Sequence, residues 1–126
     1  MKENLNSYPK GLQILIKHPQ YFGRMNAPDG TAVFKGLCGD EMEFYLVIKD
    51  EIIQDVKFFT NGCGATIACG EITARLAKGK SIDSALGISP RKVKDILKEL
   101  PADHNHCTIL AVITLYRAIA GYLLQK

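Results

Sequence analysis

Two consecutive apolar runs, separated by a short acidic pair, constrain the fold of this chain more than any other feature. Over 41–49, apolar residues alternate with mostly polar ones, which is typical of a half-buried strand. Asp50 and Glu51 allow the chain to reverse before a second alternating run, 52–59, so the pattern predicts a β-hairpin. One face of the first strand carries Met42, Phe44, Leu46 and Ile48; in the second, Ile52, Gln54, Val56 and Phe58 alternate with Ile53, Asp55, Lys57 and Phe59.

Helical patterns precede and follow the hairpin. Apolar residues at helical spacing predict a short helix over 9–17, and an Ala-rich helix over 66–78 ends before a glycine. Ser81 can cap a single short turn, and a further helix starts at Ser89 and Pro90. The last helix begins at about Cys107 and is the longest, with an apolar face wide enough to be the main core element.

A small antiparallel sheet follows from these elements. A third strand is expected around 31–35, whereas 18–31 collects Gly and Pro residues and predicts a loop that responds to the ligation state of the site. An isolated hairpin is marginally stable in water, so helices must cover its apolar face. We therefore predict an α+β fold, a small antiparallel β-sheet of about three strands covered mainly on one face by helices, with a long C-terminal helix.

Length and composition indicate one domain spanning 1–126. The chain has 47% apolar and 23% charged residues, and its net charge of +3 comes from scattered basic residues, which argues against a nucleic-acid partner. It contains neither a signal-peptide core nor about 18 consecutive apolar residues, so we expect no membrane partner. These observations predict a cytoplasmic protein.

Three of the four cysteines lie at the boundaries of predicted elements. The cytosol keeps thiols reduced, which favours metal binding or catalysis over disulfides. Cys38 lies in GLCGD before the hairpin, Cys63 lies in NGCGA where a strand gives way to a helix, and Cys107 follows His106 at the start of the last helix. A helix N-terminus favours a thiolate, and the three positions can converge on one point.

The donor types in these segments favour a soft metal. No CxxC pair is present, so the spacing matches no common zinc-finger pattern. Thiolates, an imidazole and a carboxylate suit zinc, copper(I) or an iron–sulfur cluster better than magnesium or calcium. The alternative is that each cysteine is a small buried apolar residue. Glycines beside Cys38 and Cys63 argue against it, because glycine fills no space in a core.

Four segments together resemble a known family. The segments GLCGDEM, TNGCGATIA, LAKGKSIDSA and HCTILA, in this order, resemble the IscU/NifU family of iron–sulfur cluster assembly scaffolds. The resemblance covers 21–126, leaving 1–20 as an N-terminal helical segment, and the combination of C-G-D, G-C-G and H-C is specific.

The resemblance implies a site that builds a transient [2Fe–2S] cluster from iron and sulfur and passes it to recipient apo-proteins. A cysteine desulfurase would deliver sulfur as a persulfide to Cys107 or Cys63, and a ferredoxin-type electron donor would reduce it. The protein would act stoichiometrically, as a scaffold rather than an enzyme. A carboxylate or imidazole as the fourth ligand would bind the cluster less tightly than a fourth thiolate. Weaker binding is needed if the cluster is to be passed on. The implied ligands are Cys38, Cys63 and Cys107, completed or modulated by Asp40 and His106.

The chain also departs from the family in three ways. The segment 100–104 stands where many bacterial members carry an LPPVK chaperone-recognition motif, which argues against an Hsp70-type partner. The chain ends after the first domain of NifU-like members, so we expect a stand-alone scaffold. The run 80–106 lacks the insertion of the SufU-like branch. A zinc-dependent sulfur acceptor of that branch, or a structural zinc domain, is the alternative function, and the sequence leaves open whether zinc occupies the same site and whether the protein is a homo-oligomer.

Five further residues carry weaker signals. Cys69 lies in the Ala-rich helix and is interpreted first as a packed residue, with a spare thiol ligand or sulfur acceptor as the alternative. His18 and His104 are interpreted as solvent-facing polar residues. Lys78 and Lys80 fall in a segment that the resemblance places near the site, where a lysine would help to hold an anionic cluster.

Overall fold

The computed structural model describes residues 5–37 and 39–125, and the prediction for Cys38 lies outside the described residues. Ten helical and strand elements are assigned in this part of the chain. They are η1 (Leu5–Ser7), α1 (Lys10–Lys17), β1 (Gly30–Lys35), β2 (Glu41–Lys49), β3 (Ile52–Thr60), α2 (Gly64–Ala77), α3 (Ile82–Ala85), α4 (Pro90–Ile96), η2 (Ala102–His104) and α5 (His106–Gln125).

The three strands form one antiparallel sheet in the order β1-β2-β3. The predicted hairpin is confirmed, and Asp50 and Glu51 make its turn with φ angles of 54° and 62°. Positive φ at both central residues matches the right-handed twist of the two strands, which explains how so short a connection closes the hairpin. The weaker prediction of a third strand is also confirmed.

The prediction that inward-facing and outward-facing residues alternate along the whole of β3 is wrong at the start of this strand. The register shifts between Val47 and Ile48, and Gln54 is the extra residue of the resulting bulge. Ile53 and Val56 are therefore both fully buried although two residues separate them. The alternation predicted for β2 is confirmed, with the four apolar residues of one face buried.

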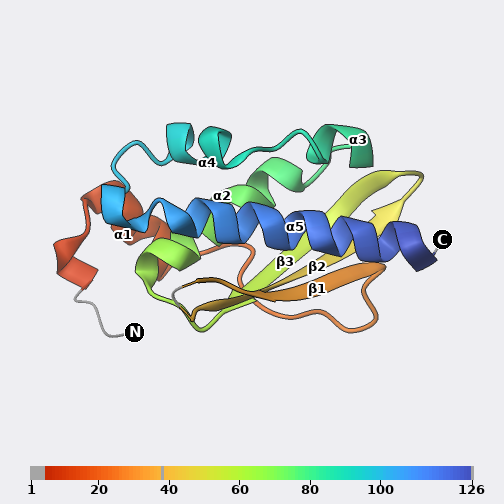
Figure 1. Ribbon diagram of the computed structural model, residues 1–126, viewed down its shortest axis with the longest axis horizontal. Helices are drawn as coiled ribbons and strands as arrows, with labels where there is room; N and C mark the ends of the chain where they lie inside the picture. The colour runs from red at the N-terminus through yellow and green to blue at the C-terminus, as the bar shows by residue number, and fades with distance from the viewer. Residues whose placement is uncertain (1–4, 38, 126) are drawn as a thin grey trace.

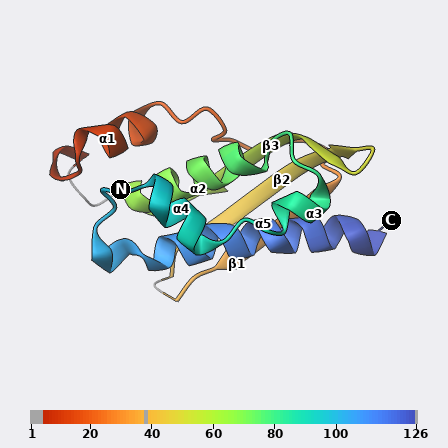
Figure 2. The same ribbon diagram turned by 90° about the horizontal axis from the view of Figure 1, so that it is seen from above.

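Helices α2 and α5 cover one face of the sheet and form its main packing layer (Figure 1, Figure 2). Helix α5 packs on β1 and β2, and α2 packs on β3 and on α5. Helix α4 lies outside this pair, while α1 packs on α2. This arrangement confirms the predicted α+β class. The largest fully buried apolar side chains are those of Phe44, Phe58, Met42, Leu46, Ile53, Leu115 and Ile119.

Helix α5 is the central core helix of the domain. By length and composition alone, the segment Ala102–Gln125 is apolar enough to cross a membrane. Nine of its residues are buried, and its contacts with β1, β2 and α2 account for its apolar composition. The apolar composition is that of a helix with a face buried against a sheet.

The predicted serine caps are confirmed at both short helices. Ser81 Oγ accepts a hydrogen bond from Ser84 N at 3.1 Å, and Ser89 Oγ accepts one from Lys92 N at 3.1 Å. Each bond satisfies a backbone N–H that has no partner within the helix. The predicted helix starts otherwise hold to within two residues.

The segment before β1 is irregular but tied to the rest of the fold. The carboxylate of Glu71, fully buried in α2, accepts hydrogen bonds of 3.0 Å from the backbone N–H groups of Gln20 and Tyr21. At the other end, Asp29 accepts a bond of 2.7 Å from Ile48 N. The loop prediction is correct up to residue 29, since β1 begins at Gly30. The response of this loop to ligation stays a prediction.

Candidate metal centre

The site forms where α2 and α5 begin, at the same end of the molecule (Figure 1). Cys63 follows β3 directly and is the N-cap residue of α2, with a half-buried side chain. Cys107 lies in the first turn of α5 and is fully buried. Each helix therefore directs the positive end of its dipole toward a cysteine, as predicted from the positions of the residues.

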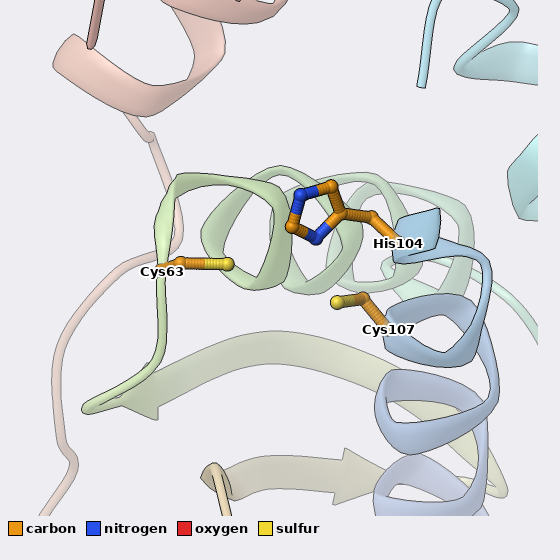
Figure 3. A group of neighbouring side chains, drawn as sticks. All are labelled: Cys63, His104 and Cys107. Carbon is orange, nitrogen blue, oxygen red and sulfur yellow. The ribbon is translucent and has the colours of Figure 1, made fainter. Parts of the chain in front are cut away.

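A histidine joins these two cysteines. Ligand atoms of Cys63, His104 and Cys107 all lie within 4.8 Å of one another. The three side chains point toward a common space, from the start of α2, the end of η2 and the start of α5 (Figure 3). Two thiols and an imidazole at this separation suit zinc or an iron–sulfur cluster, with further ligands still to be supplied.

His104 was missed by sequence reasoning, which interpreted it as solvent-facing. Its side chain is only 17% exposed, so that interpretation is wrong. The signal was its separation of three residues from Cys107, which places two side chains on one side of a helical turn. The predicted ligand His106 lies beside the group, with its Nε2 3.7 Å from Cys107 Sγ. The structure thus offers two imidazoles near the same sulfur.

Thr66 is a second residue that sequence reasoning missed. Its hydroxyl oxygen lies 3.5 Å from Cys107 Sγ and 3.6 Å from Cys63 Sγ. The same hydroxyl donates a hydrogen bond of 3.0 Å to Asp40 Oδ2. Thr66, one helical turn after Cys63, therefore links the predicted Asp40 to the two cysteines, while Asp40 itself is not among the three side chains whose ligand atoms lie within 4.8 Å of one another.

Strand ends hold the Asp40 segment in place. Asn61 Oδ1 accepts a hydrogen bond from Glu41 N at 3.1 Å, and the Thr60 hydroxyl donates one of 2.6 Å to Glu41 O. Thr60 Oγ1 also accepts a bond from Gly62 N at 3.0 Å. These bonds join the residue after Asp40 to the turn that leads into Cys63. The segment that carries Asp40 and the segment that carries Cys63 are thus fixed relative to each other.

The thiols of the two buried cysteines, Cys107 and Cys69, favour the protonated form, so the thiolate expected at Cys107 from the helix dipole is wrong for this structure. A hydrogen bond with Cys63, followed by burial, raises the pKa of Cys107 well above its usual range. Burial, with a smaller effect of Cys63, raises the pKa of Cys69 to about 12. Cys69 is completely buried in the core, which favours the packing interpretation over a ligand role. A metal that binds Cys107 must displace a proton.

The two candidate lysines lie away from the site. Lys78 is the C-cap of α2, the opposite end of that helix from Cys63, and α2 has 14 residues, a length of about 21 Å. Its Nζ lies 5.7 Å from the ring centre of Tyr21, and Lys80 follows two residues later. The expectation that one of these lysines helps to hold a cluster is wrong on this geometry, because neither side chain can span the length of α2.

Comparison with known proteins identifies the family of this chain. The NifU-like N-terminal domain family matches residues 7–126. The chain is 40% identical over 108 residues, 85% of its length and 71% of the relative's, to the iron–sulfur cluster assembly scaffold protein IscU 1 of Archaeoglobus fulgidus. It is 42% identical over 86 residues, 68% of its length and 66% of the relative's, to the iron–sulfur cluster assembly scaffold protein IscU of Escherichia coli K12.

Solved structures share the fold at lower identity. A nitrogen-fixing NifU-like protein (N-terminal) from Brucella abortus superposes with a TM-score of 0.78 at 18% identity, covering 98% of this chain and all of the other. A putative iron–sulfur cluster assembly scaffold protein for the SUF system from Fervidobacterium islandicum gives a TM-score of 0.75 at 20% identity, over 93% of this chain and 99% of the other. These two comparisons establish the fold.

Proposed function

Because this chain belongs to the NifU-like N-terminal domain family, we propose that it is a scaffold that assembles a transient [2Fe–2S] cluster and passes it to recipient apo-proteins. Relatives at 40% and 42% identity are named as scaffold proteins for iron–sulfur cluster assembly, not as enzymes. The observation that carries the proposal is the convergence of Cys63, His104 and Cys107 within 4.8 Å. Thiolate sulfur is the usual ligand of iron–sulfur clusters, and an imidazole is an established substitute.

The proposed ligand set consists of three thiolates and a fourth, weaker ligand. Cys63 and Cys107 supply sulfur, and Cys38 is proposed as the third thiolate. Asp40, His106 and the newly found His104 compete for the fourth position, where an oxygen or nitrogen ligand holds iron less firmly than a thiolate. Such a set suits a cluster that has to leave.

Sulfur delivery fixes the partners that the proposal requires. A cysteine desulfurase would transfer sulfur as a persulfide to Cys63 or Cys107, and a ferredoxin-type donor would supply the electrons that reduce it to sulfide. Cys63 is half-buried and Cys107 is fully buried, so Cys63 is the more accessible acceptor in this structure. We place this reaction in the cytoplasm, without an Hsp70-type chaperone.

Anaerobic reconstitution tests the proposal. The full chain is incubated with ferrous iron, cysteine, a cysteine desulfurase and a thiol reductant that replaces the electron donor, and visible absorption follows cluster formation. We expect Cys38→Ser, Cys63→Ser and Cys107→Ser each to abolish the stable chromophore, because a hydroxyl is a poor ligand for sulfide-bridged iron. Cys69→Ala is the matched control and should form the cluster. Failure of the wild-type chain to form a cluster, or loss with Cys69→Ala equal to the others, contradicts the proposed site.

A zinc-dependent sulfur acceptor is the second candidate. The Cys–His–Cys group suits tetrahedral zinc, and the superposing protein from Fervidobacterium islandicum is a putative cluster assembly scaffold protein for the SUF system. On the scaffold proposal, zinc competes with iron and blocks reconstitution. Zinc-loaded protein that accepts persulfide sulfur but never forms a cluster would favour the second candidate. Loss of helix content on chelation would instead indicate a structural zinc domain.

A further inference from the structure

Thr66 lies at the centre of the site without a role in the proposed function. Its side chain is fully buried, in the first turn of α2. One hydroxyl oxygen contacts Asp40 Oδ2 at 3.0 Å, Cys107 Sγ at 3.5 Å and Cys63 Sγ at 3.6 Å. A single atom thus joins a carboxylate to two thiols that come from different helices.

These three contacts match the bonding capacity of a hydroxyl group. A threonine hydroxyl has one proton to donate and two lone pairs that accept. The proton goes to Asp40, because a carboxylate is a stronger acceptor than sulfur. With that proton donated to Asp40, the oxygen can only accept from a thiol, and Cys107, which also hydrogen-bonds Cys63, has a single proton for its two contacts.

Gly62 leaves the space in which this bond forms. A Cβ atom at residue 62 would lie 2.8 Å from Asp40 Oδ2 and 2.8 Å from Thr66 Oγ1. These distances, and the 2.9 Å to Thr66 Cβ, are shorter than real Cβ contacts, so any larger residue would require the Asp40 or Thr66 side chain to shift. The pairing of Asp40 with Thr66 therefore depends on a glycine one residue before Cys63.

We propose that Thr66 is a positioning residue, whose hydroxyl holds Asp40 Oδ2 so that Oδ1 serves as an oxygen ligand beside Cys63 and Cys107. The inference rests on the proposed function, because it assumes that a metal binds these cysteines. Groups that hydrogen-bond to a ligand commonly orient it, and their loss lowers metal affinity by about 10- to 100-fold. Thr66 acts through Asp40 and does not touch the metal.

Cobalt(II) is the probe, because its absorption reports both thiolate ligation and coordination number. Titrations use the full metal-free chain under anaerobic conditions. Thr66→Val keeps the shape and removes the hydroxyl, so we expect at least about tenfold weaker binding and altered d–d bands. Thr66→Ser restores the hydroxyl and should recover wild-type affinity and spectrum. Thr73→Val is the control, since Thr73 is equally buried in α2 but donates to Cys69 O.

A double-mutant cycle separates positioning from packing. We expect Asp40→Ala to lose at least as much affinity as Thr66→Val, and the double variant to be no weaker than Asp40→Ala alone. Gly62→Ala should also weaken binding, because its Cβ displaces the Asp40 or Thr66 side chain. Metal-free thermal unfolding of each variant checks the fold.

The outcomes distinguish this inference from the function on which it rests. Wild-type protein that shows no thiolate-to-cobalt band contradicts the proposed function. If the wild type binds and Thr66→Val binds equally well, the positioning role is wrong. It is also wrong if Thr66→Ser fails to rescue, if Thr73→Val is equally damaged, or if Thr66→Val weakens binding as much in the Asp40→Ala background as alone.

Discussion

The Tyr8 hydroxyl accepts a hydrogen bond of 3.3 Å from Ala65 N, and the Tyr8 ring lies 6.3 Å from the His104 ring. One buried side chain from the N-terminal segment thus contacts the start of α2 and the end of η2. These are two of the three places that supply the Cys–His–Cys group. The segment before α1 therefore supports the site from outside.

Tyr8→Phe should lower the free energy of unfolding by about 1–3 kcal/mol, because it leaves the buried N–H of Ala65 without this acceptor. Urea denaturation of the metal-free chain measures the change. Tyr122→Phe is the control: its hydroxyl bonds Glu51 at an exposed position, so water can replace the lost partner. If the two substitutions lower the free energy of unfolding equally, the hydrogen bond between Tyr8 and Ala65 makes no particular contribution to stability.

Two glycine substitutions should change stability in opposite directions. A Cβ at Gly70 would lie 2.5 Å from Phe58 Cδ2, so Gly70→Ala should destabilise the fold by about 1–3 kcal/mol despite its better helix propensity. A Cβ at Gly11 would meet only Glu99 Oε1 at 3.4 Å, so Gly11→Ala should stabilise by about 0.4–1 kcal/mol. Thermal unfolding that moves both variants in the same direction would refute this account.

Alkylation should distinguish the cysteines. Burial raises the pKa of Cys69 to about 12, so at about pH 8 only about one thiol in ten thousand is ionised. Iodoacetamide should therefore modify the half-buried Cys63 and leave Cys69 intact in the native chain. Mass spectrometry of peptides gives the order of modification, and the same reaction in denaturant shows that all four cysteines are reactive once exposed. Modification of native Cys69 as fast as Cys63 would contradict its placement in the core.

Zinc and cobalt affinity should rise with pH. The pKa of Cys107 is raised, so its thiol is protonated at neutral pH and metal binding must release that proton. Each displaced proton contributes about a tenfold gain in apparent affinity per pH unit below the thiol pKa. Competition titrations across neutral pH, together with proton release in weakly buffered solution, measure this dependence. Affinity that stays constant with pH would exclude protonated thiols as the ligands.

Local patterns were sufficient to predict most of the elements. Alternation over β2 and the acidic pair at 50 and 51 predict the hairpin, because side chains of a half-buried strand face opposite sides in turn. The bulge at Gln54 could not be predicted, since both Ile52 and Ile53 are apolar and either can face the core. Contacts distant in the sequence fix the choice: Ile53 N donates a hydrogen bond to Lys80 O and Gly79 N donates one to Ile53 O, both of 2.8 Å.

Some residues of the candidate site could likewise be predicted from the sequence, and others could not. Cys63 and Cys107 could be found from their positions at helix starts, and Asp40 and His106 were named through a family resemblance. His104 was missed because its burial depends on how the turn η2 packs against Tyr8 and Cys63. Thr66 was missed because no chemical signature marks one threonine among the small residues of an apolar helix.

The sequence separation of the site residues indicates when the site forms during folding. The sheet is a meander of sequential neighbours, so its contacts are short in sequence and their loop-closure entropy is small. Thr66 and Cys107 are 41 residues apart and meet only after α5 has docked. A metal therefore finds no preformed group of ligands in a half-folded chain. Tight metal binding by a purified sample would thus report that the last helix has reached its native place.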